Sequence, residues 1–164
     1  MTPTVIGARG PVADSKVAVR TAQEWAAAHG GEVQLFDADF VLGPAHLLVA
    51  AERAERAFAA GTAAGTSTAV EALLYASGER QIGQALRKMG VKDGGDRVAI
   101  LGWRIASEEL LPTLHLTRDD SVLAFDEPKL RRFGFTDLEL QTVPGRLWED
   151  LVLERVALVE IAKR

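Results

Sequence analysis

The chain has no cysteine, which excludes disulfide scaffolds, thiolate metal sites and cysteine nucleophiles. Its three histidines, His29, His46 and His115, are scattered, and none has a second ligand at the spacing of a metal site. No apolar run approaches the roughly 20 residues that cross a bilayer, and the N-terminus lacks the long apolar stretch of a signal peptide. We therefore expect a cytoplasmic protein that makes no membrane contact and holds no metal.

The sequence also lacks a recognisable catalytic motif. No Ser, His and Asp set can be assigned from residue order or local pattern. Asp37 and Asp39 alternate and could share one face of an extended segment for acid–base chemistry, although such a pair is more typical of a strand end and turn. We expect no catalytic residues and no cofactor. The alternative is a small α/β enzyme or ligand-binding domain with a pocket near Asp37, Asp39 and His46.

With 164 residues, the chain has a length that suits one domain with one core, and we expect residues 1–164 to form it. Strand and helix patterns intermingle along the chain. This predicts a single two-layer α/β domain with a small, mostly antiparallel or mixed sheet, several helices and a long C-terminal helix. The strand order cannot be read from the pattern.

Local signals place the expected elements. Predicted strands are Thr4–Ala8, Val33–Phe36, Arg97–Leu101 and Ser121–Phe125. Three helices are predicted from their starting signals: one capped by Asp14 and running to about Ala28, one opened by Gly43-Pro44, and one from a capping box at Thr68–Glu71 to Gly78. Four more are predicted at Glu79–Met89, Glu108–Leu111 (ending before Pro112), Glu127–Phe133 and Leu147–Lys163. The buried stripe of the second helix is expected to comprise Leu47, Ala51, Ala54 and Phe58.

The helix predicted after Gly78 is cationic. Ile82, Leu86 and Met89 recur at helical spacing and are expected to be buried. Polar and basic residues then occupy the other side, namely Arg80, Gln81, Gln84, Arg87 and Lys88. From residue 77 to 104 there are six basic and three acidic residues, a balance of +3 against −4 for the whole chain, so the remainder carries −7. This pattern fits either an ordinary solvated face or a local RNA-binding surface.

The C-terminal helix has an unusually broad apolar arc. Leu147, Leu151, Leu158 and Ile161 form one apolar face, and Trp148, Val152, Val156 and Val159 form an adjacent one, with Arg155 between them. A surface helix usually needs a stripe only a little over 100° wide. Either this helix is buried nearly all round, or one face packs on the core and the other meets a partner.

Several ordered segments together resemble one family. They are Ile6–Arg9, Asp37–Val41 followed by His46 and Ala50, Glu71–Ile82 with its Ala-Ser-Gly-Glu-Arg-Gln-Ile run, Gly90–Gly94 with its Lys-Asp-Gly, and Glu154–Lys163. This series is similar to the small regulatory subunits of the KEOPS complex, the family of the PRPK-binding protein TPRKB, of the archaeal type. The region from Trp103 to Gln141 matches that pattern poorly, and Glu79 adds an acid to the signature.

The resemblance implies a non-catalytic subunit of the machinery that makes threonylcarbamoyladenosine in tRNA. Its expected partners are a PRPK-like kinase/ATPase subunit, the 3′ CCA end of tRNA and, indirectly, the other KEOPS subunits. The implied RNA-binding residues are Arg80, Gln81, Gln84, Arg87, Lys88 and Lys92, and the implied kinase interface is Leu151, Arg155, Leu158 and Ile161. Tyr75 and Trp103 are the aromatic residues nearest to the cationic helix for base stacking.

Overall fold

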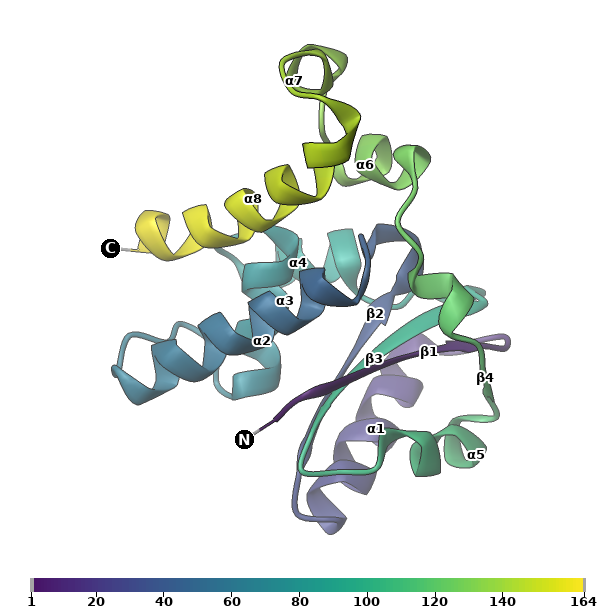
Figure 1. Cartoon of the computed structure of the whole chain (residues 1–164). Coiled ribbons are helices and arrows are strands. Elements are labelled where there is room, and N and C mark those ends of the chain that lie inside the picture. Colours follow the sequence, from purple (N-terminus) through teal and green to yellow (C-terminus); the bar gives the residue numbers. More distant parts are fainter. Residues whose placement is uncertain (1, 164) are drawn as a thin grey trace.

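A four-stranded antiparallel sheet forms the centre of the fold (Figure 1). The computed structural model describes residues 2–163, with side chains described through residue 158. The strands are β1 (Thr4–Arg9), β2 (Glu32–Asp37), β3 (Arg97–Trp103) and β4 (Thr117–Arg118), in the order β2-β3-β1-β4. In the register of this sheet, Ile100 of β3 lies between Ile6 of β1 and Leu35 of β2.

Helices make up most of the rest. The α-helices are α1 (Ser15–Ala28), α2 (Pro44–Ala59), α3 (Thr68–Ser77), α4 (Ile82–Met89), α5 (Leu111–Leu114), α6 (Glu127–Phe133), α7 (Asp137–Gln141) and α8 (Trp148–Lys163). Short 3₁₀ segments are η1 (Ala38–Phe40), η2 (Ser107–Leu110), η3 (Asp120–Leu123) and η4 (Gly145–Leu147). The expected α/β fold, antiparallel sheet and long C-terminal helix are thereby confirmed.

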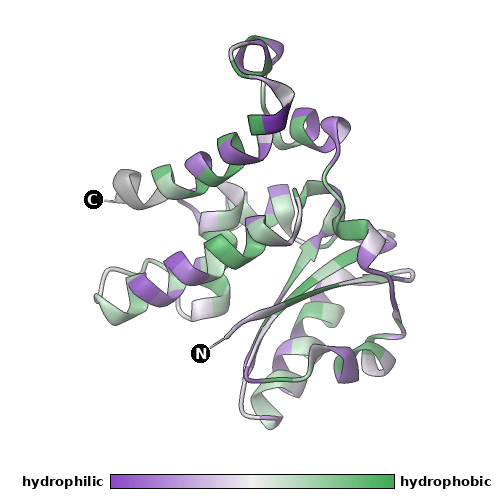
Figure 2. Cartoon of the chain, viewed as in Figure 1, coloured by the Kyte–Doolittle hydropathy of each residue, from purple (hydrophilic) through white to green (hydrophobic). Residues whose placement is uncertain are grey.

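Each face of the sheet has its own core. Val98 and Ile100 of β3 pack with α1 and α5, whereas Ala99 and Leu101 pack with α2, α3 and α8. This division follows from strand geometry, since successive side chains point to opposite faces. Figure 1 shows α1 and α5 on one side of the sheet and α2, α3, α4 and α8 on the other, and Figure 2 shows hydrophobic residues on both sides. The helices therefore cover two faces, so that three packed layers replace the two expected.

The beginnings of α1 and α2 follow the sequence signals. Asp14 caps α1, with its Oδ1 accepting from the Val17 N–H at 3.1 Å. Pro44 lies in the first turn of α2, where its missing N–H costs no hydrogen bond. Phe58 is a correction, because its side chain is 39% exposed and Ala57 is buried instead.

The beginning of α3 differs from the prediction. Ser67, not Thr68, is the N-cap, and its hydroxyl accepts from the Val70 N–H at 3.2 Å. Glu71 is buried and accepts from the Ala64 N–H at 2.9 Å, so its carboxylate binds the preceding loop instead of closing a capping box. The capping box predicted at Thr68–Glu71 is therefore wrong.

Two further corrections lie after β3. Pro112 is in the first turn of α5, so the helical segment runs through it instead of ending before it. Residues 121–125 are not a strand, because β4 is followed by η3. The edge of β1 is occupied at this point: the Gly7 N–H donates to Asp120 Oδ1 at 2.9 Å, and the Asp119 N–H donates to the Gly7 carbonyl at 2.9 Å. These bonds turn the chain away from the sheet.

A buried lysine joins two of these segments. The ammonium of Lys129 in α6 donates to the carbonyls of Val41 at 3.0 Å and Val122 at 2.7 Å. Its side chain is almost wholly enclosed, and this burial lowers the pKa of Lys129. Lys129 therefore links the end of η1 to η3 through its two hydrogen bonds.

Candidate functional site

The turn between α3 and α4 presents the centre of the cationic segment. Gly78 ends α3 with a left-handed φ of +74°, a conformation that favours glycine. Gln81 has extended backbone and precedes α4, so the helix expected from Glu79 begins three residues later, at Ile82. Arg80 and Gln81 consequently lie on an exposed turn and not in a helix.

The buried face of α4 is not the predicted one. Ala85 and Met89, four residues apart, are buried, whereas Ile82 is 37% and Leu86 44% exposed. The expectation that Ile82 and Leu86 pack inside is therefore wrong. The short helix contacts the core through one narrow stripe and leaves apolar side chains beside its polar ones.

The six predicted RNA-binding residues fall into two groups. Four of them have exposed side chains: Arg80, Gln81, Gln84 and Arg87. The other two, Lys88 and Lys92, are only partly exposed because their ammonium groups bind the protein itself. The structure therefore assigns surface positions to the first group and internal contacts to the second.

Lys88 and Lys92 each neutralise a helix end. The Lys88 Nζ donates to the carbonyl of Ser77, the last residue of α3, at 3.0 Å and lies 3.9 Å from the Phe133 ring centre. Burial lowers the pKa of Lys88, an effect that Glu79 opposes and Arg155 reinforces. The Lys92 Nζ donates to the Lys88 carbonyl at 3.4 Å, near the end of α4. Cations stabilise the negative C-terminal ends of helices in this way.

A groove runs between α1 and α4 along the outer strand β2. It has a volume of about 470 Å³, with Leu35 and Val91 among the residues that line it. Three exposed cations border it: Lys16 and Arg20 from α1, and Arg87 from α4. Among the residues that the structure describes, none of these three has a carboxylate within 4 Å. Sequence reasoning missed Lys16 and Arg20, although their spacing of four residues places both on one face of α1.

The aromatic residues considered for base stacking are not available. Tyr75 and Trp103 are both fully buried, and the Trp103 indole N–H donates to Glu55 Oε1 at 3.0 Å. Exposed apolar surface next to the basic groove comes from Leu86. Any base contact there would therefore be aliphatic.

The alternative pocket of Asp37, Asp39 and His46 is not formed. Asp37 ends β2 and accepts from the Asp39 N–H at 3.0 Å, and burial raises the pKa of its carboxyl. Asp39 pairs with Arg97 at 3.4 Å. A hollow of only about 70 Å³ borders both carboxylates but not His46. The two aspartates mark a strand end and a 3₁₀ turn, so the extended segment on which they would share a face is absent.

His46 belongs to the interior. Its Nδ1 accepts from the Leu42 N–H at 3.1 Å, which leaves the Nε2–H to donate to the Ala76 carbonyl at 2.8 Å. Burial lowers the pKa of His46 to about 4, so the ring is neutral at pH 7. A histidine near a helix N-terminus is predicted from the sequence to lie at the surface or half-buried, and the buried position of His46 shows that prediction to be wrong. The residues described contain no group of three or more His, Cys, Asp or Glu side chains arranged to hold a metal ion.

The two faces of α8 have different surroundings. Val152 and Val156 are buried against the core shared with α2 and α3. Leu158 is 50% exposed, Leu147 is also exposed and Leu151 is partly so. Arg155 donates to Glu139 Oε2 at 2.9 Å and lies over the Phe135 ring. Of the two alternatives, the structure has one face on the core and the other open, while the side chain of Ile161 lies outside the described residues.

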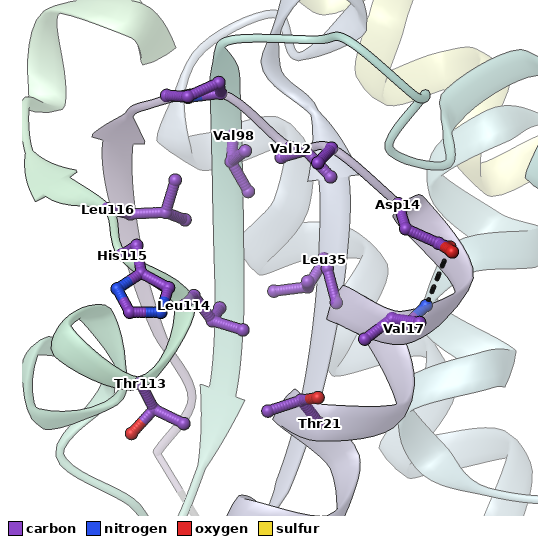
Figure 3. A pocket seen from close by; sticks show the side chains of 13 residues that line it. Val12, Asp14, Val17, Thr21, Leu35, Val98, Thr113, Leu114, His115 and Leu116 are labelled. Atoms are coloured by element: carbon purple, nitrogen blue, oxygen red, sulfur yellow. Dashed lines mark hydrogen bonds between the residues drawn. The ribbon is translucent and has the colours of Figure 1, made fainter.

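A second hollow lies on the α1 side of the sheet, the side away from α8. It has a volume of about 310 Å³ between the start of α1 and the α5 region, and Figure 3 shows Val12, Leu35, Val98 and Leu116 around it. Its acidic residue, Asp14, is engaged in capping α1, as the dashed line in Figure 3 indicates. This hollow is suited to an apolar group.

No helix among the described residues is long and apolar enough to cross a membrane.

Comparison with known proteins identifies the family. The family described as "Kinase binding protein CGI-121" matches residues 17–141. The matched range includes the region from Trp103 to Gln141 but not the segments Ile6–Arg9 and Glu154–Lys163. No curated protein gives a significant match. Since the family match covers most of the sequence, the chain belongs to the CGI-121 family of kinase-binding proteins.

Proposed function

We propose that this protein is a non-catalytic subunit of a KEOPS complex, which modifies tRNA with threonylcarbamoyladenosine. It binds a PRPK-like kinase/ATPase subunit and recruits tRNA through the 3′ CCA end, and it meets the other subunits indirectly. The observation that carries the proposal is an uncovered apolar face on α8 in a chain of a kinase-binding family.

The kinase-binding surface is the open side of α8 and of η4 before it, made of Leu158 and Leu147 with Arg155 beside them, while Leu151 is half-buried against the core and adds only its outer edge. Apolar side chains repeating along one side of a helix are suited to a groove or flat apolar surface on a partner. Because Val152 and Val156 hold the other side of α8 on the core, the helix is supported and presents this face without rearrangement.

The RNA-binding surface comprises the exposed turn at Arg80 and Gln81, the outer side of α4 at Gln84 and Arg87, and the groove bordered by Lys16 and Arg20. Exposed cations contact phosphates, and amide groups can reach the edges of unpaired bases. Lys88 contributes positive charge to this surface although it is bound to the end of α3, whereas Lys92 is bound to the end of α4 and its charge is offset by Asp37 at 3.7 Å.

The kinase assignment is tested by gel filtration with a purified PRPK-like kinase. Leu158→Glu places a charge on the open face of α8, and we expect it to abolish co-elution. Val17→Glu is the matched control, since Val17 is similarly exposed but lies on α1, across the sheet. Thermal unfolding of both variants should match the wild type. Co-elution of a folded Leu158→Glu variant would contradict the proposed interface.

A further inference from the structure

A small hollow separates the turn after α3 from the helix α8. It has a volume of about 330 Å³ and is bordered by Gly78, Arg80, Lys88, Arg155 and Leu158, together with Ser77 and Glu79. The hollow thus joins two segments that are far apart in the sequence. One carries the proposed RNA-binding turn and the other the proposed kinase-binding face.

Three cations border the hollow: Arg80, Lys88 and Arg155. Lys88 and Arg155 each lie over an aromatic ring. Phe133 and Phe135 stack, with ring centres 5.8 Å apart and an interplanar angle of 21°. The Lys88 Nζ lies 3.9 Å from the centre of the first ring, and the Arg155 guanidinium carbon lies 4.2 Å from the centre of the second. Cation–π contacts of this kind orient a charge while leaving its other donors available.

The turn itself helps to position Arg155. The side chain of Arg155 passes close to Gly78, where a Cβ would meet its Cγ at 3.4 Å. Its guanidinium donates one hydrogen bond, to Glu139 at 2.9 Å, out of the five that the group can make. Among the described residues, Arg155 therefore has further N–H groups at the border of the hollow that can donate to a ligand.

Cations outnumber carboxylates around the hollow: Arg80, Lys88 and Arg155 border it, whereas the carboxylates are Glu79 at its border and Glu139, which pairs with Arg155. Among the residues that the structure describes, Arg80 and Lys88 have no carboxylate within 4 Å. Lys88 and Arg155 are close enough for Arg155 to disfavour the charged form of Lys88 and so lower its pKa. Like charges gathered around a hollow attract an anion, and phosphate oxygens match guanidinium and ammonium donors in geometry.

We propose that this hollow binds a phosphate group of the RNA strand, with Arg80, Lys88 and Arg155 as its ligands. This inference rests on the proposed RNA binding and adds Arg155, a residue that the family resemblance assigns to the kinase interface. RNA bound to the turn would reach the hollow directly, because Arg80 lies on the turn and also borders the hollow. A phosphate held here places the RNA against the kinase-binding helix.

The test is a titration of the ¹⁵N-labelled protein at constant ionic strength. One arm uses inorganic phosphate, and the other uses a single-stranded RNA tetranucleotide ending in CCA. The variants are Arg80→Gln and Arg155→Gln, with Arg146→Gln as a charge-matched control at the exposed start of the α8 region. Arg80→Gln removes no internal contact among those described, so it remains informative if Arg155→Gln disturbs folding.

We expect amide shifts at residues 77–80, 88 and 155 in both arms. Loss of one charge-assisted ligand should weaken RNA binding about tenfold in Arg80→Gln and in Arg155→Gln, and leave Arg146→Gln within about twofold of the wild type. RNA binding that all three variants weaken equally, or shifts that map only to the α1–α4 groove, would overturn the hollow and leave the proposed function intact. Phosphate shifts without any RNA binding by the wild type would overturn the RNA assignment itself.

Discussion

The imidazole of His46 donates its Nε2–H to the carbonyl of Ala76, at 2.8 Å, and so joins the start of α2 to the end of α3. Its Nδ1 accepts from the Leu42 N–H, which makes the neutral ring part of the folded backbone network. Ala76 lies two residues before Gly78. The exposed turn at Arg80 is therefore anchored from inside by a buried histidine.

This arrangement predicts a pH dependence of stability. The pKa of His46 is lowered from its ordinary value of 6.5 to about 4 in the folded state. As the pH falls below 6.5, the unfolded chain therefore binds a proton at this histidine that the folded chain does not bind. The stability contributed by neutral His46 is full above the unfolded pKa and is lost as the pH falls toward 4. Between pH 7 and pH 5 this amounts to about 2 kcal/mol.

Urea unfolding at pH 7 and pH 5 measures this effect. The free energy of unfolding of the wild type should fall by about 2 kcal/mol more than that of His46→Gln, which has no proton to bind. Equal changes for the two proteins would contradict the buried neutral state of His46.

Lys129 gives a prediction about internal polar contacts. Lys129→Met keeps the length of the side chain but leaves the carbonyls of Val41 and Val122 without their donor. We expect a loss of about 2 kcal/mol in the free energy of unfolding, because two unsatisfied buried carbonyls outweigh the relief from burying a charge. Chemical denaturation measures this loss. Lys16→Met, at an exposed position on α1, is the control and should stay within about 0.5 kcal/mol of the wild type. An equally stable Lys129→Met variant would mean that the two contacts contribute nothing net.

Arg80 gives a prediction about the RNA surface. Arg80→Glu reverses a charge on an exposed turn, so we expect RNA affinity to fall by more than about tenfold while thermal stability is unchanged. Electrophoretic shift with tRNA at moderate salt measures the effect, and tRNA without its 3′ CCA end shows whether that end is required. Arg146→Glu carries the same charge change outside this surface and serves as the control. If the two variants bind tRNA equally well, the turn is not an RNA contact.

Arg20 tests the groove, which only the structure reveals. Arg20 and Arg87 face the same groove from α1 and α4. Arg20→Glu should weaken tRNA binding as strongly as Arg87→Glu, and it should reduce the dependence of affinity on salt because one phosphate contact is lost. Binding measured over a salt series checks both effects. An unaltered salt dependence in Arg20→Glu would restrict the RNA surface to α4 and the turn before it.

The limits of prediction from the sequence follow from the range of each interaction. The Asp14 cap and the Gly78 stop depend on neighbours a few residues away, and both are confirmed. The failure at residues 121–125 has a distant cause, since Gly7 lets the chain approach β1 and bonds to Asp119 and Asp120. An apolar run cannot report such a contact.

For the candidate site too, local features could be predicted from the sequence and distant contacts could not. Helical periodicity correctly indicates that Gln84 and Arg87 are exposed. It cannot indicate that Lys88 lies over Phe133, nor that Lys92 binds the end of α4. It also cannot place Lys16 and Arg20 at the same groove as Arg87, because α1 and α4 are far apart in the sequence.

The position of α8 has a consequence for how the protein is made. Val152 and Val156 close the core over α2 and α3, and yet they leave the ribosome after every element that they cover. The β-sheet and α1 can assemble early, whereas the apolar surface of α2 and α3 stays open until α8 emerges. Nascent chains stalled before residue 148 would therefore expose this surface and attract chaperones, so this part of the core closes only after α8 has emerged.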